Sequence, residues 1–597
     1  MKQYLSVFTS SFAIIVLVLS PSLTCASPQN TKVLFDHLAQ ETYEALWDFH
    51  PVDATYAGFH VHDARLGSYT PQTVAETAKK LKEILGRIEG IDSTRLSVDD
   101  QIDRALLISN LKMELFRLEK LRTWETNPKF YTDECINGIY YLLLRDFAPL
   151  SARAQRAAER MRQIPRVLDE ARQNVRNPPR LYAAAAIEEL SAGEEFIDQS
   201  AKSLGQQFPG LNESLQADAQ QAIAAMRKYR TELAKALPGL KDNFAMGKAD
   251  YTYILKTDDL LPFDSDSLLR IGENAFAETD SLIKALSPRK AAYDKAHPAP
   301  EQPVLRPPRY FSKADIIAYQ QDEIDSMRDW VAKRGIASVP DYVGRLQMTE
   351  TPAFLLGIIP GAAMEPPAPL DSVQTSYYYE PPFPDPLDSA TKIRWYNTAH
   401  YRRWKGGVVH EGYPGHHLQL SIANHTSSLT RKLQGNTPMI EGWALYCEQL
   451  AAENGLYDRR SVSSSNEEAA TDSFLPLHWL GGVNFRAARI ILDVKLHTGK
   501  MSYDDAWKYM VENFGPDTSF FQREVRRYCL SPTQPMSYLV GKLQIIALRD
   551  EFLSQGPDRR DSPYSQVGGK LLKEFHDRLL NEGSIPVSLI RRKLNEH

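Results

Sequence analysis

SVDDQIDRALLISNLKMELFRLEKL, residues 97–121, carries the pattern of an amphipathic helix. Apolar residues recur every three or four positions, as they do on the side of a helix that packs against a protein core. The residues with this spacing are Ile102, Leu106, Met113 and Phe116. Ser97 followed by Asp100 is typical of a capping box, so the pattern predicts a helix that begins after Ser97.

Similar amphipathic runs extend over much of the chain. They occur near residues 31–50, 72–90, 151–175 and 216–237. Helical signals resume after Ala390, where the run EGWALYCEQLAAENG ends at Gly455 and the run RAARIILDVKLHTG ends at Gly499. The sequence therefore predicts a mainly α fold.

Two proline-rich segments interrupt the helical pattern. Residues 287–311 contain too many prolines to continue a helix and are expected to form a long surface connection. The second segment, from Pro360 to Pro386, contains TSYYYEPPF, in which Ser376 to Glu380 are expected to form a small edge strand. An edge strand can hold an extended peptide, although a strand packed on the body of the protein is the alternative.

These segments suggest a division of the chain into four parts. We expect a signal peptide over residues 1–26, an N-terminal helical lobe over 27–286, a proline-rich connection with helices and a short edge strand over 287–386, and a C-terminal helical lobe over 387–597.

The N-terminus has the composition of a secretory signal peptide. Lys2 precedes the apolar run FAIIVLVL at residues 12–19, and small residues precede a plausible cleavage site after Ala26. The apolar run is much shorter than the roughly 20 residues that span a bilayer, which makes a membrane anchor the weaker alternative. We therefore expect a secreted or periplasmic protein that does not contact the membrane after the signal peptide is removed.

The remaining composition excludes some classes of partner. The formal net charge is -5 and the pI is about 6.3. Because no long stripe of lysine and arginine is present, we expect no nucleic-acid partner. Four cysteines do not make a disulfide framework; Cys447 and Cys529 could pair, and buried free thiols are the alternative.

HEGYPGHHLQ, residues 410–419, gathers three histidines around a glutamate. It is a stretched form of the HExxH motif, in which two histidines on one helix face bind zinc and the glutamate is the general base. Here the second histidine follows His410 by six or seven positions, which an unbroken helix would place about 9 to 10 Å away. Pro414 and Gly415 predict a bulged or restarted helix, so that either His416 or His417 can join His410 as a ligand.

Glu441 in NTPMIEGWALYCEQL is the candidate for a third ligand. Its helix is apolar around Trp443, and a buried carboxylate is costly unless it is paired or binds a metal. Glu448 shares the helix face and could support a ligand or, alternatively, bind the metal itself. A simple helix cap is the other alternative for Glu441.

Four motifs together resemble a bacterial family classified as domain of unknown function number 885. They are HEGYPGHHLQ, EGWALYCE, RIILDVKLH and RRYCLSPTQPMSYLVGKLQI. The remote relatives of this family are the helical Glu-zincins, which include angiotensin-converting enzyme and the thimet-type oligopeptidases. The resemblance implies a two-lobed helical metallopeptidase-like body with a deep central cleft and a zinc ion at its floor.

The resemblance also implies roles for single residues. It aligns the HE pair with His410 and Glu411, the following Gly-His with Gly415 and His416, and the downstream ligand with Glu441. In angiotensin-converting enzyme a His and a Tyr ten residues later bind the substrate carbonyl and oxyanion; Tyr528 and Tyr538 have this spacing. The first of the two is a Tyr here, and PTQP stands where the family has PGQA.

Further candidates surround this set. His497 follows Arg489 and Asp493 on one helical face and could line the cleft, although a structural histidine is the alternative. A substrate's terminal carboxylate could bind to a basic side chain in the last third of the chain. The candidates for that contact are Arg526, Arg527 and Lys542.

The expected function is therefore a zinc-dependent peptidase that cleaves short peptides, as an oligopeptidase or in a carboxypeptidase-like manner. Glu411 would be the general base, and Tyr538 would help to stabilise the oxyanion. The alternatives are a metal-dependent hydrolase of another amide or ester and a non-catalytic peptide-binding protein. The sequence leaves the oligomeric state open.

Overall fold

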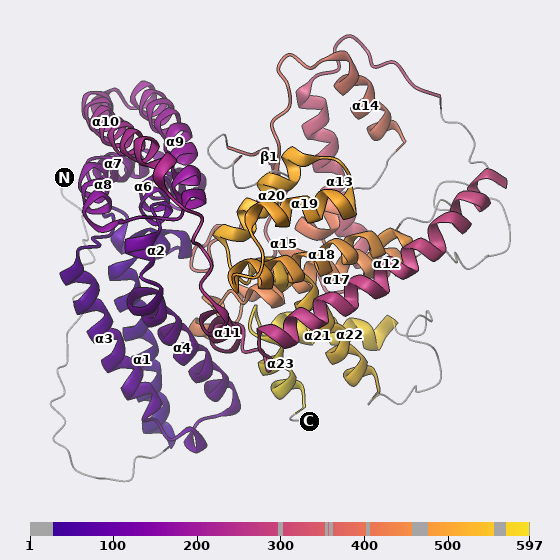
Figure 1. The fold of residues 1–597 in the computed structure, drawn as a ribbon, viewed down its shortest axis with the longest axis horizontal. Coiled ribbons are helices and arrows are strands. Elements are labelled where there is room, and N and C mark those ends of the chain that lie inside the picture. The colour runs from indigo at the N-terminus through magenta and orange to yellow at the C-terminus, as the bar shows by residue number, and fades with distance from the viewer. Residues whose placement is uncertain are drawn as a thin grey trace, which may run out of the picture.

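The computed structural model describes residues 28–296, 303–352, 356, 362–401, 406–456, 476–554 and 569–595. The predicted signal peptide lies outside these residues. The prediction of a mainly α fold with a small β element is confirmed, because helices dominate and the strands form a single three-stranded sheet within the described ranges. Figure 1 shows an N-terminal group of helices in indigo and purple beside a larger C-terminal group in orange and yellow. Throughout the described ranges, every helix is too short or too polar to cross a membrane.

The N-terminal group packs around one large apolar core that runs from Phe35 to Leu233. Its helices are α1 (Pro28–Phe49), α2 (Pro51–Ala57), α3 (Pro71–Glu89), α4 (Val98–Phe116), α5 (Thr123–Thr126), α6 (Lys129–Leu144), α7 (Leu150–Met161), α8 (Ile164–Asn174), α9 (Arg180–Gln207) and α10 (Asn212–Ala236). As predicted, α4 begins after Ser97, whose hydroxyl accepts a hydrogen bond from the Asp100 amide at 3.1 Å. The run expected at 151–175 forms two helices, α7 and α8.

The C-terminal group contains the remaining helices. These are α11 (Lys248–Thr257), α12 (Ser265–Ala296), α13 (Lys313–Arg334), α14 (Ser389–His400), α15 (His416–Ala423), α16 (Leu429–Lys432), α17 (Thr437–Glu453), α18 (Leu477–His497), α19 (Tyr503–Phe514), α20 (Thr518–Leu530), α21 (Gln534–Ser554), α22 (Gly569–Asn581) and α23 (Val587–Leu594). Its main core gathers Trp443 and Tyr446 of α17, Ile545 of α21 and Phe575 of α22.

Helix α12 corrects the prediction that residues 287–311 cannot be helical. It continues through Pro288 to Ala296 and packs along α18, where Gly272 lies against Ile490. A proline costs the helix one hydrogen bond, but lysine, arginine and alanine fill the following turns and favour helix strongly. The lobe boundary that we expected at residue 286 lies within α12, and the division into lobes stays a prediction.

The sheet corrects the prediction of an edge strand at Ser376–Glu380. Its strands are β1 (Leu346–Glu350), β2 (Ala363–Glu365) and β3 (Ser376–Glu380), in the order β1-β3-β2. β3 is central: it pairs in parallel with β1, from Leu346 opposite Ser376, and antiparallel with β2. Tyr378 and Tyr379 are both buried, which fits a strand covered on both faces. Since both of its backbone edges are paired, β3 cannot receive a peptide.

The cysteines also differ from one expectation. Cys447 and Cys529 are free and buried, and they belong to two different apolar cores. The proposed pairing of these two residues is therefore wrong. Burial raises the pKa of the Cys447 thiol well above its usual value, so both residues behave as small apolar side chains.

Helices α17 and α21 pack backbone to backbone at two glycines. A Cβ atom on Gly541 would lie 1.7 Å from the Pro438 carbonyl oxygen, and one on Gly442 would lie 2.4 Å from the Gly541 carbonyl carbon. Only hydrogen atoms fit between these backbones. This contact fixes the distance between two helices that both carry residues of the candidate site.

We expect Gly541→Ala to lower the free energy of unfolding by about 1–3 kcal/mol, because the added methyl group forces α17 and α21 apart. Urea denaturation measures this change. Gly86→Ala is the matched control: Gly86 lies in α3, and a Cβ atom there would meet no atom within 4 Å. The free energy of unfolding of the control should stay the same or rise by up to about 1 kcal/mol. An equal loss of stability in both variants would contradict the close contact between α17 and α21.

His60 connects the N-terminal helices to the segment that precedes β3 through two polar contacts. Its Nδ1 lies 2.9 Å from Asp63 Oδ2, and its Nε2 lies 2.8 Å from Asp371 Oδ1. The ring stacks on Phe147 with centroids 3.7 Å apart. Burial alone lowers the pKa of His60, but the two carboxylates outweigh it and raise this pKa from 6.5 to about 9.

The pH dependence of stability follows from this shift. The folded protein binds more protons than the unfolded chain between pH 6.5 and about 9, so the contribution of His60 is complete below pH 6.5 and is lost as the pH rises to 9. We expect the free energy of unfolding of the wild type to fall more steeply across this window than that of His60→Gln. His62→Gln is the control, because burial lowers the pKa of His62. Equal slopes for the wild type and His60→Gln would show that Asp63 and Asp371 do not stabilise the charged form of His60.

Candidate metal centre

A broken helix brings the two ends of the HEGYPGHH motif together. Residues Val408–Gly412 form a π-helical turn, η7, and α15 restarts at His416. Between them the Gly415 amide donates to the Val409 carbonyl at 3.1 Å. A Cβ atom on Gly415 would lie 1.9 Å from the carbonyl oxygen of His410, so only glycine allows this approach. The break and restart predicted from Pro414 and Gly415 are present.

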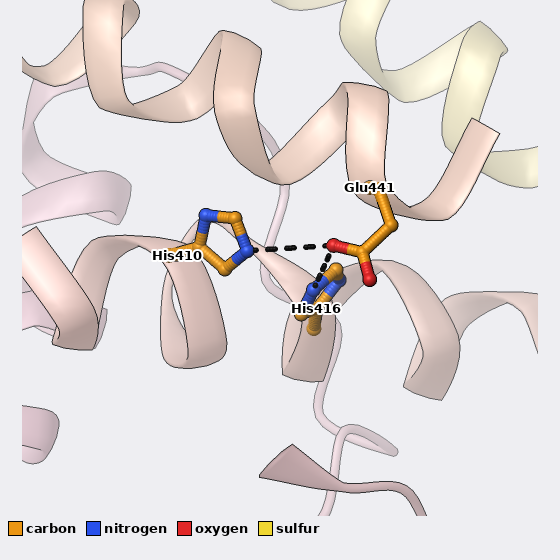
Figure 2. A group of neighbouring side chains, drawn as sticks. All are labelled: His410, His416 and Glu441. Atoms are coloured by element: carbon orange, nitrogen blue, oxygen red, sulfur yellow. Dashed lines mark ion pairs between the residues drawn. The ribbon is translucent and has the colours of Figure 1, made fainter. Parts of the chain in front are cut away.

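His410, His416 and Glu441 converge in this break, as Figure 2 shows. Glu441 Oε2 lies 3.3 Å from His416 Nε2 and 3.6 Å from His410 Nε2. The two imidazole rings are nearly perpendicular, with centroids 4.8 Å apart. In the part of the chain that the structure describes, no other group of three such side chains has this metal-binding spacing.

Helix α17 holds Glu441 in place. The helix is capped by Asn436, whose side chain accepts from the Met439 amide at 3.1 Å, so Glu441 is an interior residue and not the cap. The Trp443 indole donates to the Pro414 carbonyl at 2.8 Å. This bond ties α17 to the loop between the two histidines, and it sets Glu441 opposite both of them.

Glu448 orients the first histidine. Because a carboxylate only accepts, His410 donates its Nδ1 proton to Glu448 Oε1 at 2.8 Å, and its Nε2 faces Glu441. Burial opposes the charge on Glu448, but Arg486 and His410 lower its pKa to about 2. Burial alone would lower the pKa of His410. The carboxylates of Glu441 and Glu448 outweigh this effect and raise the pKa to about 10. Glu448 therefore supports a ligand and lies behind it.

The cluster fits a divalent cation. Glu441 Oε2 and His416 Nδ1 are buried and have no hydrogen-bond partner among the described residues. Tetrahedral zinc with bonds of about 2.0–2.1 Å separates two of its ligand atoms by about 3.3 Å, close to the distances from Glu441 Oε2 to the two histidines. Half-buried carboxylates at 411, 441 and 448 interact electrostatically with the two histidines or with one another, and a cation would offset their repulsion.

Glu411, the predicted base, follows His410 in η7. Its carboxylate interacts electrostatically with His410, His416 and Glu441, which places it beside the cluster. It makes no hydrogen bond to any described residue, so its oxygens are free to accept a proton. Burial raises the pKa of the Glu411 carboxyl above its usual value, and the two histidines oppose this shift.

His417 faces away from the cluster. Its Nδ1 lies 2.7 Å from Ser376 Oγ of β3, and its Nε2 lies 3.1 Å from the Gly344 carbonyl and 3.0 Å from Tyr413 Oη. The side chain is fully buried, and burial lowers its pKa to about 4. Of the two alternatives left open by the sequence, the structure brings His416 to the cluster and uses His417 to join α15 to the sheet.

The two predicted tyrosines lie in different surroundings. Tyr538 stacks on His410 with ring centroids 6.2 Å apart and an interplanar angle of 24°. Tyr528 is completely buried, donates to Glu524 at 2.9 Å and accepts from Arg489 at 2.9 Å. Tyr538 is therefore beside the cluster, whereas the hydroxyl of Tyr528 is already engaged in a network of its own.

His497 is a buried residue of α18 outside the cluster. Its Nε2 donates to the Tyr528 carbonyl at 3.0 Å, and its ring stacks on Tyr251. Burial lowers the pKa of His497 to about 4, so the ring is neutral. These contacts fit the alternative that His497 is a structural histidine.

The predicted carboxylate-binding cations also differ from one another. Arg526 forms a bidentate pair with Glu188 on the surface. Arg527 donates to Gln534 and Glu524 close to the cluster. Lys542 is buried, has no partner for its ammonium group among the described residues, and has a pKa lowered by burial to about 8.

Sequence reasoning missed Gln534. Its side chain donates to Glu441 Oε1 at 3.2 Å and to Tyr538 Oη at 3.0 Å, so it touches both a candidate ligand and a candidate catalytic residue. It lies in the PTQP stretch that the family resemblance includes. The sequence signal that could have identified Gln534 is its position on α21, four residues before Tyr538.

Two solved structures share this fold. One is a proposed lipoprotein of unknown function from Shewanella oneidensis, with 21% identity, a TM-score of 0.70, and coverage of 94% of this chain and 100% of that one. The other is a proposed lipoprotein from Colwellia psychrerythraea, with 18% identity, a TM-score of 0.69, and coverage of 95% and 99%. At these identities the likeness establishes the fold alone. No curated protein shows significant similarity to the chain.

The match to a protein family covers far more of the chain than any single motif does. Residues 51–594 match the family described as bacterial protein of unknown function, DUF885. This range includes the sheet, every described helix except α1, and the whole His410, His416 and Glu441 cluster. The chain therefore belongs to the DUF885 family of bacterial proteins.

Proposed function

We propose that the protein is a zinc-dependent peptidase that hydrolyses short peptides. The observation that carries the proposal is the buried oxygen of Glu441, which lies 3.3 and 3.6 Å from two histidine nitrogens without a hydrogen bond. His410, His416 and Glu441 would hold the metal. Two histidines and one glutamate are the ligand set of catalytic zinc sites that keep a position open for water.

Bound zinc supplies Lewis-acid chemistry, which lowers the pKa of water to about 7 and polarises a carbonyl group. Glu411 accepts the proton of the attacking water and passes it to the leaving amine. The electrostatic interaction of the Glu411 carboxylate with both histidines supports this role. A storage site would need the ligands but not this additional carboxylate.

Tyr538 would donate a hydrogen bond from its hydroxyl group to the carbonyl oxygen of the substrate as that oxygen gains negative charge. Its ring lies against His410, which keeps the hydroxyl near the cluster. Burial raises the pKa of Tyr538, so the phenol keeps its proton at neutral pH. The confined cleft implied by the Glu-zincin resemblance would limit substrates to short peptides.

We infer that the protein acts outside the cytoplasm. The N-terminal apolar run is typical of a secretory signal peptide. Two proteins with the same fold are described as proposed lipoproteins, which agrees with export. Peptides in the periplasm or the surroundings of the cell would then be the accessible substrates.

Metal binding can be tested with two neighbouring histidines. We expect the wild type and His417→Asn to bind one zinc ion per chain, and His416→Asn to lose it, because of these two neighbours His416 faces Glu441 and His417 faces Ser376. Elemental analysis after dialysis and competition with a zinc-binding dye measure this difference. His417→Asn is the matched control, and loss of zinc from that variant alone would show that the ligand assignment is wrong.

The reaction can be tested with Glu411→Gln and a mixture of short unblocked peptides. We expect the zinc-loaded wild type to cleave peptides and the variant to lose at least about 100-fold in kcat, in the range of general-base catalysis. Mass spectrometry of the products also shows from which end the peptides are shortened.

Bound zinc is measured in both proteins, because the variant must retain it for the comparison to report on the base. Cleavage at wild-type rates by zinc-loaded Glu411→Gln would exclude Glu411 as the base. If zinc-loaded wild type leaves every peptide intact while it hydrolyses other amides or esters, the substrate class is wrong and the metal chemistry stands.

A further inference from the structure

Gln534 connects the candidate metal site to the candidate oxyanion donor. Its Nε2 lies 3.2 Å from Glu441 Oε1 and 3.0 Å from Tyr538 Oη. The other oxygen of Glu441, Oε2, is the one that faces the two histidines. One amide group therefore contacts the back of a ligand and the hydroxyl of Tyr538.

The orientation of this amide is fixed by Arg527. The Arg527 guanidinium donates from Nη1 to Gln534 Oε1 at 2.7 Å, and a guanidinium has no acceptor. The amide oxygen must therefore face Arg527, and the amide NH2 must face Glu441 and Tyr538. A rotated amide would place two oxygens against each other at Glu441 and two donors against each other at Arg527.

Arg527 is itself held in position. Its Nη2 donates to Glu524 Oε2 at 3.1 Å, and the same carboxylate accepts from Arg489 at 2.9 Å and from Tyr528 at 2.9 Å. Glu524 is buried; desolvation opposes its charge, but Arg489 and Arg527 lower its pKa to about 2. The carboxylate thus stays charged and holds the guanidinium at the end of the Gln534 side chain.

The backbone around Gln534 is held by a second buried carboxylate. Asp493 of α18 is fully buried and accepts from the Thr533 amide with one oxygen and from the Met536 amide with the other, both at 3.3 Å. These two amides flank Gln534. The start of α21 is therefore tied to α18 on both sides of the residue that touches Glu441.

We propose, on the basis of the proposed function, that Gln534 is a positioning residue with two effects. It holds Glu441 Oε1, so that only Oε2 is offered to the metal. It also donates to the oxygen of Tyr538, so that the phenol proton is directed away from Gln534 and toward the substrate. A carboxylate that binds through one oxygen leaves a metal position open for water or substrate.

The inference predicts separate effects on metal affinity and on turnover. Gln534→Met removes the amide at nearly constant size, and Gln534→Asn keeps an amide that is too short to reach both partners. We expect each variant to bind zinc about 10- to 100-fold more weakly, as is typical when a residue that orients a ligand is removed. At saturating zinc we expect a comparable fall in kcat with KM changed less than about threefold, because Tyr538 acts on the transition state.

Two matched controls accompany these variants. Gln544→Met makes the same change ten residues later on α21, and Arg523→Met changes an exposed arginine four residues before Arg527 on α20. Both controls should keep wild-type zinc affinity and kcat. Arg527→Met should weaken both quantities in the same direction as the Gln534 variants, because it releases the amide.

Zinc affinity is measured by competition with a chelating dye, activity on the peptide mixture, and folding by thermal denaturation. Zinc affinity and kcat of both Gln534 variants within about twofold of Gln544→Met would overturn the inference. If the wild type binds zinc but cleaves no peptide, the proposed function fails while the affinity ratio still decides whether Gln534 holds Glu441. If the wild type cleaves peptides and the Gln534 variants match it, only the role of Gln534 is wrong.

Discussion

The candidate site depends on one close approach, that of the Gly415 backbone to the carbonyl oxygen of His410. A side chain at position 415 would overlap this oxygen at 1.9 Å, so the helix can break and restart only with glycine there. The restart brings His416 beside His410, although the two are six positions apart in the sequence. Helix α17 then completes the cluster. Its Trp443 donates a hydrogen bond to the Pro414 carbonyl, and Glu441 lies two positions before Trp443 on the same helix. A motif that could not chelate on a straight helix thereby gains three converging side chains.

Local patterns predicted much of the helical structure and the candidate residues of the site. The N-terminal boundary of α4 at Ser97 follows from capping chemistry, and the ends of α17 and α18 lie close to Gly455 and Gly499 as expected. His410, Glu411 and Glu441 could be chosen because their chemistry is specific and their helices have clear apolar faces. The choice between His416 and His417 could not be made, because it depends on backbone angles in the three residues that separate η7 from α15.

The remaining differences arise from contacts between segments far apart in the chain. β3 is central because β1 and β2 both pair with it, and no feature of SYYYE alone specifies how many neighbours it has. α12 passes Pro288 with favourable residues beyond it and α18 alongside. Gln534 acquires its importance from Arg527, Glu441 and Tyr538 together, and a glutamine by itself carries no chemical signal that would single it out.

The glycine contact between α17 and α21 has a consequence for how this scaffold could be altered. One helix carries Glu441, and the other begins with Gln534 and Tyr538, so the spacing of these groups is set by main-chain atoms rather than by side chains. Other side chains on the two helices could therefore be exchanged while that spacing stays the same. Substitutions on these helices should preserve the arrangement of the site provided that Gly442 and Gly541 are retained together with the contacts of Trp443, Glu448 and Gln534.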